Sequence, residues 1–434
     1  MGVEGFLERR ARVSEPWVIL TVLFVAVVAA VVVTAITGRF SSPERWEYSE
    51  IAENILKGRG AYYTHLGTKY YFYGSAVYPV LLATVLRASN QSEAAMLVLQ
   101  ALLFALTSLV IYLIARTCFG KAEASIPAFL AASHPGGLIY VGKLHSLTLD
   151  VFLIVLSFLL LLRATSTAAP VRAIGTGLVA GLAALSRGTV VPFYSLWAAW
   201  FLWRERKRFF RAVWVVIAVA MGGALVIAPV LVSGYLMYGE LIPLRTDTGE
   251  NLWYGNHPGA SGTPYTLSLP PVPVISQMSP ELLSRIVGMT EIVQNRVFTA
   301  AVLDFAWNDP TAAFLLFLKK IYYFWWFSPH TGLLYPAAWL TAYKIYYSLV
   351  LFFAVMGLLV SLRSTRPSAW SGTSLFLLMA GSVSIVQALF HVETRHRWQV
   401  EALLLIFTAA GFLYCLRYFN KSSLTTAPAV NTPC

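Results

Sequence analysis

Glu44 and Glu47 lie in a polar, tyrosine-rich stretch, 39–92, that follows the first long apolar run of the chain. The residues around them predict a short helix that Ser42 caps and Gly58 ends, because serine favours a helix start and glycine a helix end. At 100° per residue, Glu44 and Glu47 would share the apolar face of this helix. Carboxylates in that position can act as a general base. The alternative is that Glu44 only complements the helix dipole and Glu47 only pairs with an arginine.

A second polar stretch, 246–264, is rich in glycine, asparagine and small hydroxyl side chains around Trp253 and Tyr254. Aromatic faces with amide and hydroxyl partners suit a ligand that carries many hydroxyl groups. An ordinary turn-rich loop uses the same residue types, so these residues alone leave both interpretations open.

Basic side chains between apolar runs are candidates for binding a phosphate. The run 391–397 holds Arg395 and Arg397, and Arg187 lies between two short apolar segments. Arginine suits bidentate phosphate contacts, although an arginine near a membrane can also simply reach for water. Metal binding has weak support, because His145 and Asp150 are five positions apart and no closely spaced set of ligand residues accompanies them.

The composition identifies the class of protein that must position these residues. Of 434 residues, 58% are hydrophobic and only 12% are charged, so the chain predicts an all-α, polytopic membrane protein that forms a single domain. The net charge of +12 does not indicate nucleic-acid binding, because the basic residues cluster beside apolar runs. Cys118, Cys415 and Cys434 have neither metal-ligand spacing nor a disulfide pattern.

Ten segments are apolar enough to be predicted as transmembrane helices. The first follows a basic N-terminus, like a signal peptide, but it is too long for one and is expected to stay uncleaved. The ten are 16–38, 93–116, 122–141, 147–164, 172–187, 189–203, 211–232, 342–362, 371–390 and 398–418.

The distribution of basic residues predicts the orientation. They concentrate in alternate loops, which places both termini and the tail 421–434 in the cytoplasm. The segments 39–92 and 233–341 then become two large loops on the outer face. Within them, 78–87 and 312–327 are predicted to form interfacial helices, because the first is too short to span and the second carries two lysines at its middle.

These segments, in this order, resemble the GT-C glycosyltransferases, in particular the dolichyl-phosphate-mannose protein mannosyltransferases and lipid A aminoarabinose transferase. The family's first outer loop has an Asp, a Tyr four residues later and an Ala eight residues later, and Glu44, Tyr48 and Ala52 match that spacing. Residues 252–262, Leu-Trp-Tyr-Gly-Asn-His-Pro-Gly-Ala-Ser-Gly, are close to the family's Leu-Trp-x-Gly-Asn-Asn-Pro-x-Ala-Thr-Gly. Further similarities are Gly58, Gly60 and 78–79 in the first loop, 185–187 to Leu-Thr-Arg, 320–325 to a lysine-aromatic helix, and 393–397 to Glu-Arg-Tyr-Arg.

Two positions depart from the family pattern. Glu44 replaces the aspartate, which keeps a carboxylate but lengthens its reach by one methylene. Leu147 stands where the second outer loop often has a glutamate, so a family-like metal ligand is missing there unless His145 or Asp150 replaces it.

The resemblance implies an inverting glycosyltransferase that moves a sugar from a polyprenyl-phosphate donor to a hydroxyl of a lipid, glycan or protein. It implies a bacterial inner (plasma) membrane, with the active site on the outer face and no nucleic acid as a partner. Glu44 would be the base and Glu47 a positioning group; no metal ligand is assigned, and a divalent metal is left open. The donor phosphate would be bound by Arg187, Lys320, Arg395 and Arg397, and the substrates by Tyr48, Asn251, Trp253, Asn256 and His257.

Two alternatives remain open at this stage. A flippase or transporter could bind a lipid-linked sugar without reacting, but its spans should be polar and often repeated, whereas these are nearly free of charge. A non-catalytic relative could serve as an assembly subunit, in keeping with Leu147.

Overall fold

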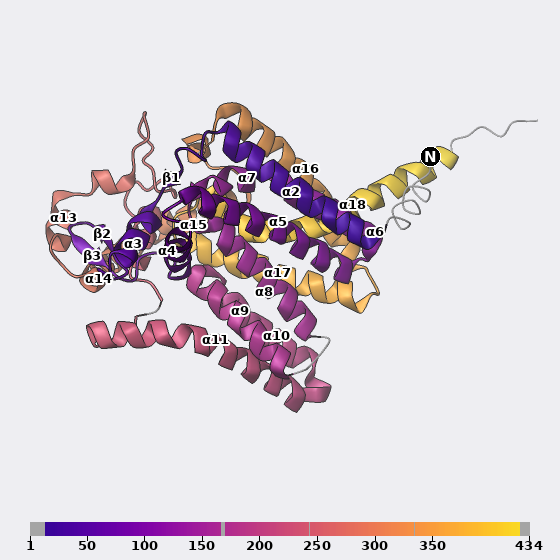
Figure 1. Ribbon diagram of the computed structural model, residues 1–434, viewed down its shortest axis with the longest axis horizontal. Helices are drawn as coiled ribbons and strands as arrows, with labels where there is room; N and C mark the ends of the chain where they lie inside the picture. The colour runs from indigo at the N-terminus through magenta and orange to yellow at the C-terminus, as the bar shows by residue number, and fades with distance from the viewer. Residues whose placement is uncertain (1–13, 166–169, 243, 334, 426–434) are drawn as a thin grey trace, which may run out of the picture.

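The computed structural model describes residues 14–165, 170–242, 244–333 and 335–425. Long helices lie side by side in a bundle, and the shorter elements gather at one end of it (Figure 1). The α-helices are α2 (Glu15–Ile36), α3 (Glu47–Leu56), α4 (Val77–Ala88), α5 (Glu93–Cys118), α6 (Lys121–Ala132), α7 (Pro135–Val141), α8 (Leu147–Ala164), α9 (Pro170–Ser186), α10 (Val191–Arg204), α11 (Phe209–Tyr238), α12 (Thr248–Gly255), α13 (Pro280–Ile286), α14 (Glu291–Asn308), α15 (Pro310–Trp325), α16 (Ala337–Leu362), α17 (Pro367–Leu389) and α18 (Trp398–Thr425).

Four short strands and five 3₁₀ turns complete the described chain. Strand β1 (Glu44–Arg45) pairs in parallel with β4 (Lys143–Leu144), and β2 (Tyr63–His65) forms an antiparallel hairpin with β3 (Thr68–Tyr70). The β1–β4 pair joins the first polar loop to the connection between α7 and α8. The 3₁₀ turns are η1 (Gly188–Val190), η2 (Arg206–Arg208), η3 (Val274–Gln277), η4 (Pro329–Leu333) and η5 (Thr394–Arg397).

Seven helices among the described residues are long and apolar enough to cross a membrane: α2, α5, α8, α11, α16, α17 and α18. The protein is therefore a multi-pass membrane protein, as predicted, but the count of ten spans is not confirmed. The predicted segment 122–141 splits into α6 and α7, because Pro135 cannot continue a helix from the preceding turn. The predicted segments 172–187 and 189–203 correspond to the shorter helices α9 and α10.

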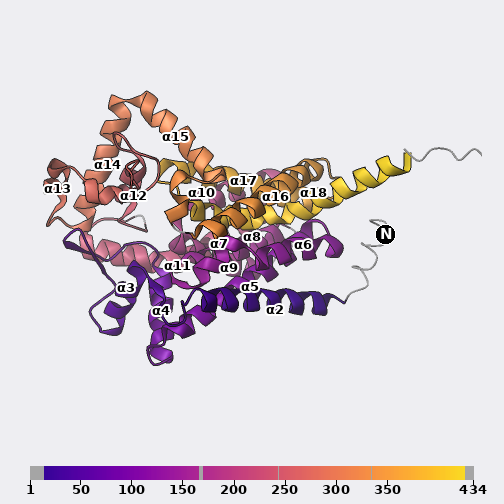
Figure 2. The same ribbon diagram turned by 90° about the horizontal axis from the view of Figure 1, so that it is seen from above.

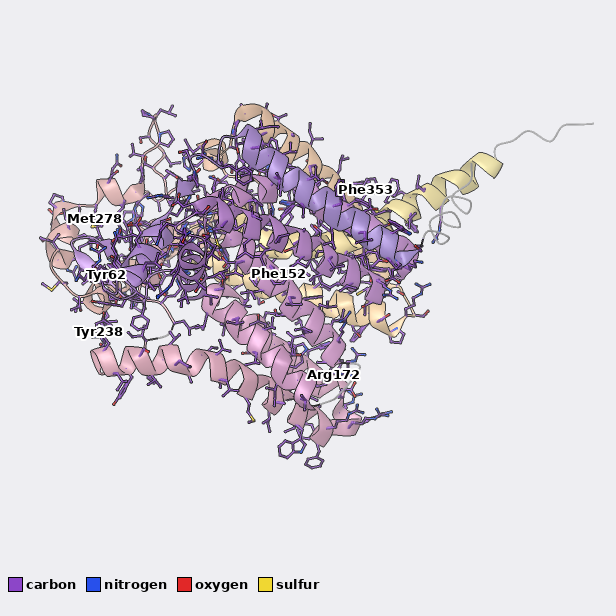
Figure 3. All side chains as sticks on the ribbon, in the orientation of Figure 1. Tyr62, Phe152, Arg172, Tyr238, Met278 and Phe353 are labelled. Atoms are coloured by element: carbon purple, nitrogen blue, oxygen red, sulfur yellow. The ribbon has the colours of Figure 1, made fainter. Side chains whose placement is uncertain are left out.

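The two large polar segments meet at one end of the bundle. Helix α2 begins and α18 ends at the opposite end, as the two perpendicular views show (Figures 1 and 2). Tyr62, Tyr238 and Met278 mark the end where α3, α13 and α14 gather, and Arg172 lies toward the other side of the bundle (Figure 3). We call the first of these ends the loop end. Segments 39–92 and 233–341, which the basic residues predicted to share one face, do lie together there.

Two helix pairs pack closely enough to bring their backbones into contact. A Cβ on Gly177 of α9 would lie 2.0 Å from the Val219 carbonyl oxygen of α11, and a Cβ on Gly357 of α16 would lie 1.9 Å from the Phe407 carbonyl oxygen of α18. Small residues at such contacts let membrane helices approach each other. Helix α9 leads directly into Arg187, and α18 directly follows η5, so both close pairs fix elements that carry polar side chains at the loop end.

The two segments predicted as interfacial helices form α4 and α15, of 12 and 16 residues. Neither is among the seven candidate spans, and their position in the interface stays a prediction. Helix α18 continues to Thr425, into the segment predicted as a tail. Residues 426–434 lie outside the described residues, and Cys434 with them.

Candidate active site

The acidic stretch begins differently from the prediction. Glu44 lies in strand β1, and helix α3 begins only at Glu47, after Trp46 in an extended conformation. The predicted helix start at Ser42 is wrong, because the ladder to β4 holds the backbone of Glu44 extended. Glu47 therefore occupies the first helical turn in place of Glu44. The predicted helix end is confirmed, since Gly58 has φ +69° just after the last helical turn.

Both carboxylate oxygens of Glu44 are bound by other side chains. Lys143 Nζ lies 3.0 Å from Oε1, and Arg39 Nη2 lies 3.0 Å from Oε2. Trp46 Nε1 also donates to Oε1 over 3.1 Å. Burial lowers the pKa of Lys143, and the pairing with Glu44 offsets part of that shift. In this arrangement Glu44 holds two cations in place.

The carboxylate of Glu47 has no hydrogen bond or ion pair with another side chain among the residues that the structure describes. Burial raises the pKa of Glu47 above its ordinary value of 4.5. The charges of Arg395 and Arg245 oppose that shift, while Asp247 adds to it, so these three residues are the electrostatic neighbours of Glu47. The backbone N–H of Glu47 itself also bonds this carboxylate. A carboxylate with a raised pKa and no side-chain partner fits a general base better than one held between two cations.

Two of the predicted phosphate-binding arginines, Arg187 and Arg395, act on each other electrostatically, and Arg395 also acts on Glu47. Arg187 Nη1 is 3.7 Å from Asp150 Oδ2, and its buried Nε has no hydrogen-bond partner in the described part of the chain. Arg395 Nη2 is 2.5 Å from Glu393 Oε2. Burial is the main cause that lowers the pKa of Arg187, and the charge of Arg395 lowers it further. The two guanidinium groups therefore face one region.

Tyr48 is a core residue below this region. Its side chain is 5% exposed, and its ring packs edge-on against Tyr78 and His145. The Tyr48 hydroxyl accepts a hydrogen bond from Ser146 Oγ over 3.3 Å. Burial raises the pKa of Tyr48, so the hydroxyl stays protonated. This placement makes Tyr48 a support for the site floor, and its predicted contact with substrate stays a prediction.

His145 and Asp150, the two residues considered as replacement metal ligands, are already bound to protein groups. His145 Nδ1 accepts from the backbone N–H of Leu147 over 3.0 Å, and its Nε2 lies 3.3 Å from Arg395 Nη1. Asp150 accepts hydrogen bonds from two serines and lies beside Arg187. The structure therefore gives no support to a metal site at this pair.

Lys320 and Asn256 form a hydrogen bond with each other, and no arginine takes part in it. Lys320 is completely buried, and its Nζ donates to Asn256 Oδ1 over 2.6 Å. Asn256 Nδ2 in turn donates to the carbonyl oxygen of Leu389 over 2.7 Å. Burial lowers the pKa of Lys320 to about 7. The pair fastens the end of α12 to α15 and α17, and a phosphate contact of Lys320 stays a prediction.

Arg397 lies outside the site, although it is only two positions from Arg395. Its side chain has no exposed surface, and its Nε donates to Glu401 Oε2 over 2.8 Å. The guanidinium lies 3.6 Å from the ring centre of Tyr347, and its Nη1 donates to two backbone carbonyls. With its donors engaged in this way, Arg397 is not placed to bind the donor phosphate.

The other predicted substrate residues mostly hold their own segment together. Asn251 Nδ2 donates to the backbone oxygen of Asp247 over 2.7 Å and to its Oδ2 over 3.0 Å. Trp253 is buried, and its ring centre lies 5.0 Å from that of His257. His257 Nε2 is buried without a hydrogen-bond partner among the described residues.

Three residues of the last loop could in principle hold a metal ion. Potential ligand atoms of His391, Glu393 and His396 all lie within 4.8 Å of one another. However, Glu393 and His396 form a capping box for η5, in which each side chain accepts a backbone N–H of the other. Arg395 also binds the Glu393 carboxylate. The capping box and Arg395 engage Glu393 and His396, and the adjacent arginine disfavours a further cation, so we assign no metal to the three residues.

Sequence reasoning missed Lys143 and the pair of Arg245 and Asp247. Arg245 Nε and Nη2 lie 2.8 and 2.5 Å from the two Asp247 carboxylate oxygens. A signal was available, because an Arg-x-Asp triplet directly before the Asn251 segment suggests a paired guanidinium. Lys143 carried a weaker signal, as a lone lysine in a short outer connection.

Comparison with known families supports the resemblance seen in the sequence. Residues 75–232 match the model of the dolichyl-phosphate-mannose-protein mannosyltransferase family. That match contains Lys143, Asp150 and Arg187 but not the two glutamates. No curated protein sequence matches the chain.

Solved structures of an archaeal oligosaccharyltransferase share the fold. The oligosaccharyltransferase of Archaeoglobus fulgidus in its apo form is 17% identical, with a TM-score of 0.58, over 98% of this chain and 53% of that one. Archaeal oligosaccharyltransferase AglB from the same organism, in complex with an inhibitory peptide and a dolichol-phosphate, is 16% identical, with a TM-score of 0.54, over 96% and 52%. This chain thus spans about half the length of those proteins. ArnT from Cupriavidus metallidurans bound to undecaprenyl phosphate aligns with a TM-score of 0.38 at 14% identity, over 97% of this chain and 81% of that one.

Proposed function

We propose that this protein transfers a sugar from a polyprenyl-phosphate donor to an acceptor hydroxyl, with inversion, at the outer face of the membrane. The family match over 75–232 and the shared fold support a membrane glycosyltransferase. The acceptor would be a lipid, a glycan or a protein, and the membrane a bacterial plasma membrane with both chain termini in the cytoplasm. The observation that carries the proposal is the Glu47 carboxylate, which no other side chain binds in the described part of the chain and which has Arg395 and Arg245 as electrostatic neighbours.

The donor phosphate would lie between Arg187 and Arg395. Arg187 follows the last residue of α9, and Arg395 lies in η5 just before α18. Both positions are at the ends of helices in the bundle, where the head group of a membrane lipid sits with its chain alongside the helices. Arginines held in advance by Asp150 and Glu393 would stabilise the charge that develops on the leaving phosphate.

Glu47 would act as the general base. Its carboxylate takes the proton of the acceptor hydroxyl as that oxygen bonds to the anomeric carbon. The bond from that carbon to the phosphate oxygen breaks, and polyprenyl phosphate leaves with the electron pair. Inversion follows because the acceptor attacks from the side opposite the phosphate. We assign the base to Glu47, whereas the sequence resemblance favoured Glu44, because both oxygens of Glu44 are bound by Lys143 and Arg39.

Matched glutamine variants test this assignment. Glu47→Gln should lower the transfer rate by about 10²- to 10⁴-fold, the usual contribution of a general base, while donor binding is kept. Glu44→Gln should lower the rate less than Glu47→Gln, because the Glu44 carboxylate is held by Lys143 and Arg39. Glu53→Gln is the control, because Glu53 sits in the same helix but forms exposed ion pairs with Arg45 and Lys57.

The assay uses purified protein with labelled polyprenyl-phosphate sugars and membrane lipids, and follows donor consumption and the anomeric configuration of the product. A Glu47→Gln protein that transfers at the normal rate would remove Glu47 as the base. If Glu44→Gln instead lost the chemical step while still binding donor, the base would be Glu44, as the resemblance implied. Donor binding without consumption by the unmodified protein would favour a transporter or a non-catalytic subunit.

A further inference from the structure

Arg245 differs from the other two arginines of the site in its position and its free donors. It lies in the large loop between α11 and α12, whereas Arg187 and Arg395 adjoin helices of the bundle. Its side chain keeps 30% of its surface exposed, against 14% for Arg187 and 13% for Arg395. Its Nη1 makes no hydrogen bond with any residue that the structure describes. Arg245 therefore presents an open edge to the site.

The backbone on both sides of Arg245 is fixed. Leu244 has φ +66°, a conformation that a residue with a branched side chain rarely adopts without support. Thr246 is tied to the first polar loop, because its N–H donates to the Phe72 carbonyl oxygen over 3.0 Å. Its hydroxyl also bonds the buried carboxylate of Glu291. These contacts stabilise the direction in which Arg245 leaves the chain.

The side chain is held by a chain of partners. Asp247 binds Arg245 through two parallel hydrogen bonds, and is itself 2% exposed. Asn251 donates to Asp247 Oδ2 over 3.0 Å, which keeps that carboxylate in place. Such a bidentate pair uses only one edge of a guanidinium and leaves the Nη1 donors for an oxyanion.

We propose that Arg245 is a third donor-phosphate ligand, contributed by the outer loop, with Asp247 and Asn251 as the residues that position it. This inference rests on the proposed function, which assigns the donor phosphate to Arg187 and Arg395. The backbone N–H of His391 donates to the Asn251 carbonyl oxygen over 3.3 Å, which ties Arg245 and its two partners to the short loop that carries Arg395. The charge of Arg245 also acts on Glu47 and on Arg187. A phosphate there would be bound from two sides, by Arg187 and Arg395 at the helix ends and by Arg245 in the loop.

Binding of a sugar-free lipid tests the inference without requiring transfer. The full chain in nanodiscs is titrated with undecaprenyl phosphate, with undecaprenol as the lipid that lacks the phosphate, and with inorganic phosphate as the free anion. Arg245→Ala should weaken undecaprenyl phosphate binding by about 10- to 100-fold, the range for hydrogen bonds to charged groups, and leave undecaprenol binding unchanged. The affinity of Arg245→Lys for undecaprenyl phosphate should lie between those of Arg245→Ala and the unmodified protein, because lysine keeps the charge but loses the bidentate geometry of the guanidinium.

Two further variants separate a phosphate contact from a general loss of structure. Asp247→Asn should weaken binding less than Arg245→Ala, since the guanidinium remains but is held less firmly. Arg296→Ala is the matched control, because Arg296 forms an exposed ion pair with Glu240 in the same large loop and should bind like the unmodified protein. Inorganic phosphate should compete in an Arg245-dependent way if the head group alone is recognised. Competition by undecaprenol as strong as that by the phosphate lipid would overturn the proposal.

The outcomes also distinguish this inference from the proposed function. Equal affinity of Arg245→Ala and unmodified protein for undecaprenyl phosphate, with normal transfer by the latter, would overturn the role of Arg245 alone. A large loss of transfer with unchanged lipid binding and unchanged donor KM would instead make Arg245 a partner of Glu47 and also overturn the inference. Arg245-dependent lipid binding in a protein that transfers no sugar would support Arg245 and contradict the proposed activity.

Discussion

Two clusters of charged and polar side chains, which include Arg395 and Arg397 only two positions apart, differ in how completely their members bind one another. The site cluster contains Glu47, Arg187, Arg245 and Arg395. The membrane cluster contains His134, Tyr343, Arg397 and Glu401. In the membrane cluster both Glu401 oxygens accept bonds, from His134 and Tyr343 at 3.0 and 2.8 Å and from Arg397 at 2.8 Å. In the site cluster Glu47 has no such partner, and two arginines keep unused donors.

Both clusters are rich in charged groups, so the number of such groups does not identify the active site of this protein. A cluster in which every donor and acceptor is used can stabilise helix packing, but it has nothing left to bind a substrate. A cluster with unused donors and acceptors costs free energy in the free protein, and a ligand can supply the missing partners.

The largest effect on stability should come from breaking the membrane cluster. Arg397→Met leaves Glu401 buried without its main counter-ion, which typically costs about 3–5 kcal/mol. Thermal unfolding in detergent measures the loss. Transfer per folded molecule should change little, in contrast to Glu47→Gln. A paired replacement, Arg397→Met with Glu401→Leu, should recover part of the loss, because it removes both charges together. Full stability in the single variant would show that the cluster does not hold the helices.

The pH dependence of transfer should separate the two neighbouring arginines. Glu47 must be ionised to act as the base, and burial raises its pKa above 4.5, so the rate should fall as the pH falls through that raised value. The charge of Arg395 lowers the pKa of Glu47, so Arg395→Met should move the acid limb to higher pH. Arg397→Met should leave the limb in place. If the acid limb of the pH–rate profile does not move in Arg395→Met, the charge of Arg395 does not act on the pKa of Glu47.

Lys320 belongs to neither cluster, and its buried amino group has a neutral partner, the side chain of Asn256. Burial lowers its pKa to about 7 from an ordinary value of 10.5. Between these values the unfolded chain binds more protons than the folded one, so this group should make the protein more stable as the pH rises from about 7 toward 10.5. Lys320→Gln should abolish that part of the rise. Stability curves of the two proteins that run parallel from pH 7 to 9 would contradict it.

The smallest expected effect concerns the pair of His65 and Glu250, which joins β2 to α12 at 2.8 Å. Burial acts to lower the pKa of His65, but the bond and charge of Glu250 outweigh it and raise the pKa above 6.5. The pair therefore stabilises the loop end fully below pH 6.5 and loses this effect as the pH rises through the raised value, opposite in sign to Lys320. Hydrogen exchange of the hairpin should show about 1 kcal/mol of pH-dependent protection, which His65→Ala removes. Protection that does not vary with pH would exclude the ion pair.

Much of the architecture follows from local properties of the sequence. Long apolar runs predict membrane helices because each run must be apolar enough by itself to lie in lipid. The breaks are local too, since Pro135 explains why one predicted span is two helices. What could not be predicted is the start of α3, because a two-residue ladder to β4, 99 positions further on, keeps Glu44 extended.

The candidate site shows the same division. The sequence was enough to bring the acidic stretch, Arg187, the Asn251 segment and Arg395 to one end of a membrane protein, because alternating basic loops and hydrophobic lengths decide which segments share a face. Tertiary structure alone decided which side chains keep free atoms there. Lys143 forms an ion pair with Glu44, whereas no side chain binds Glu47 in the described part of the chain. Glu401 forms an ion pair with Arg397, whereas Arg395 faces the site. Hydrogen bonds and ion pairs act over about 3 Å, so they depend on packing between distant segments, which no spacing along the chain records.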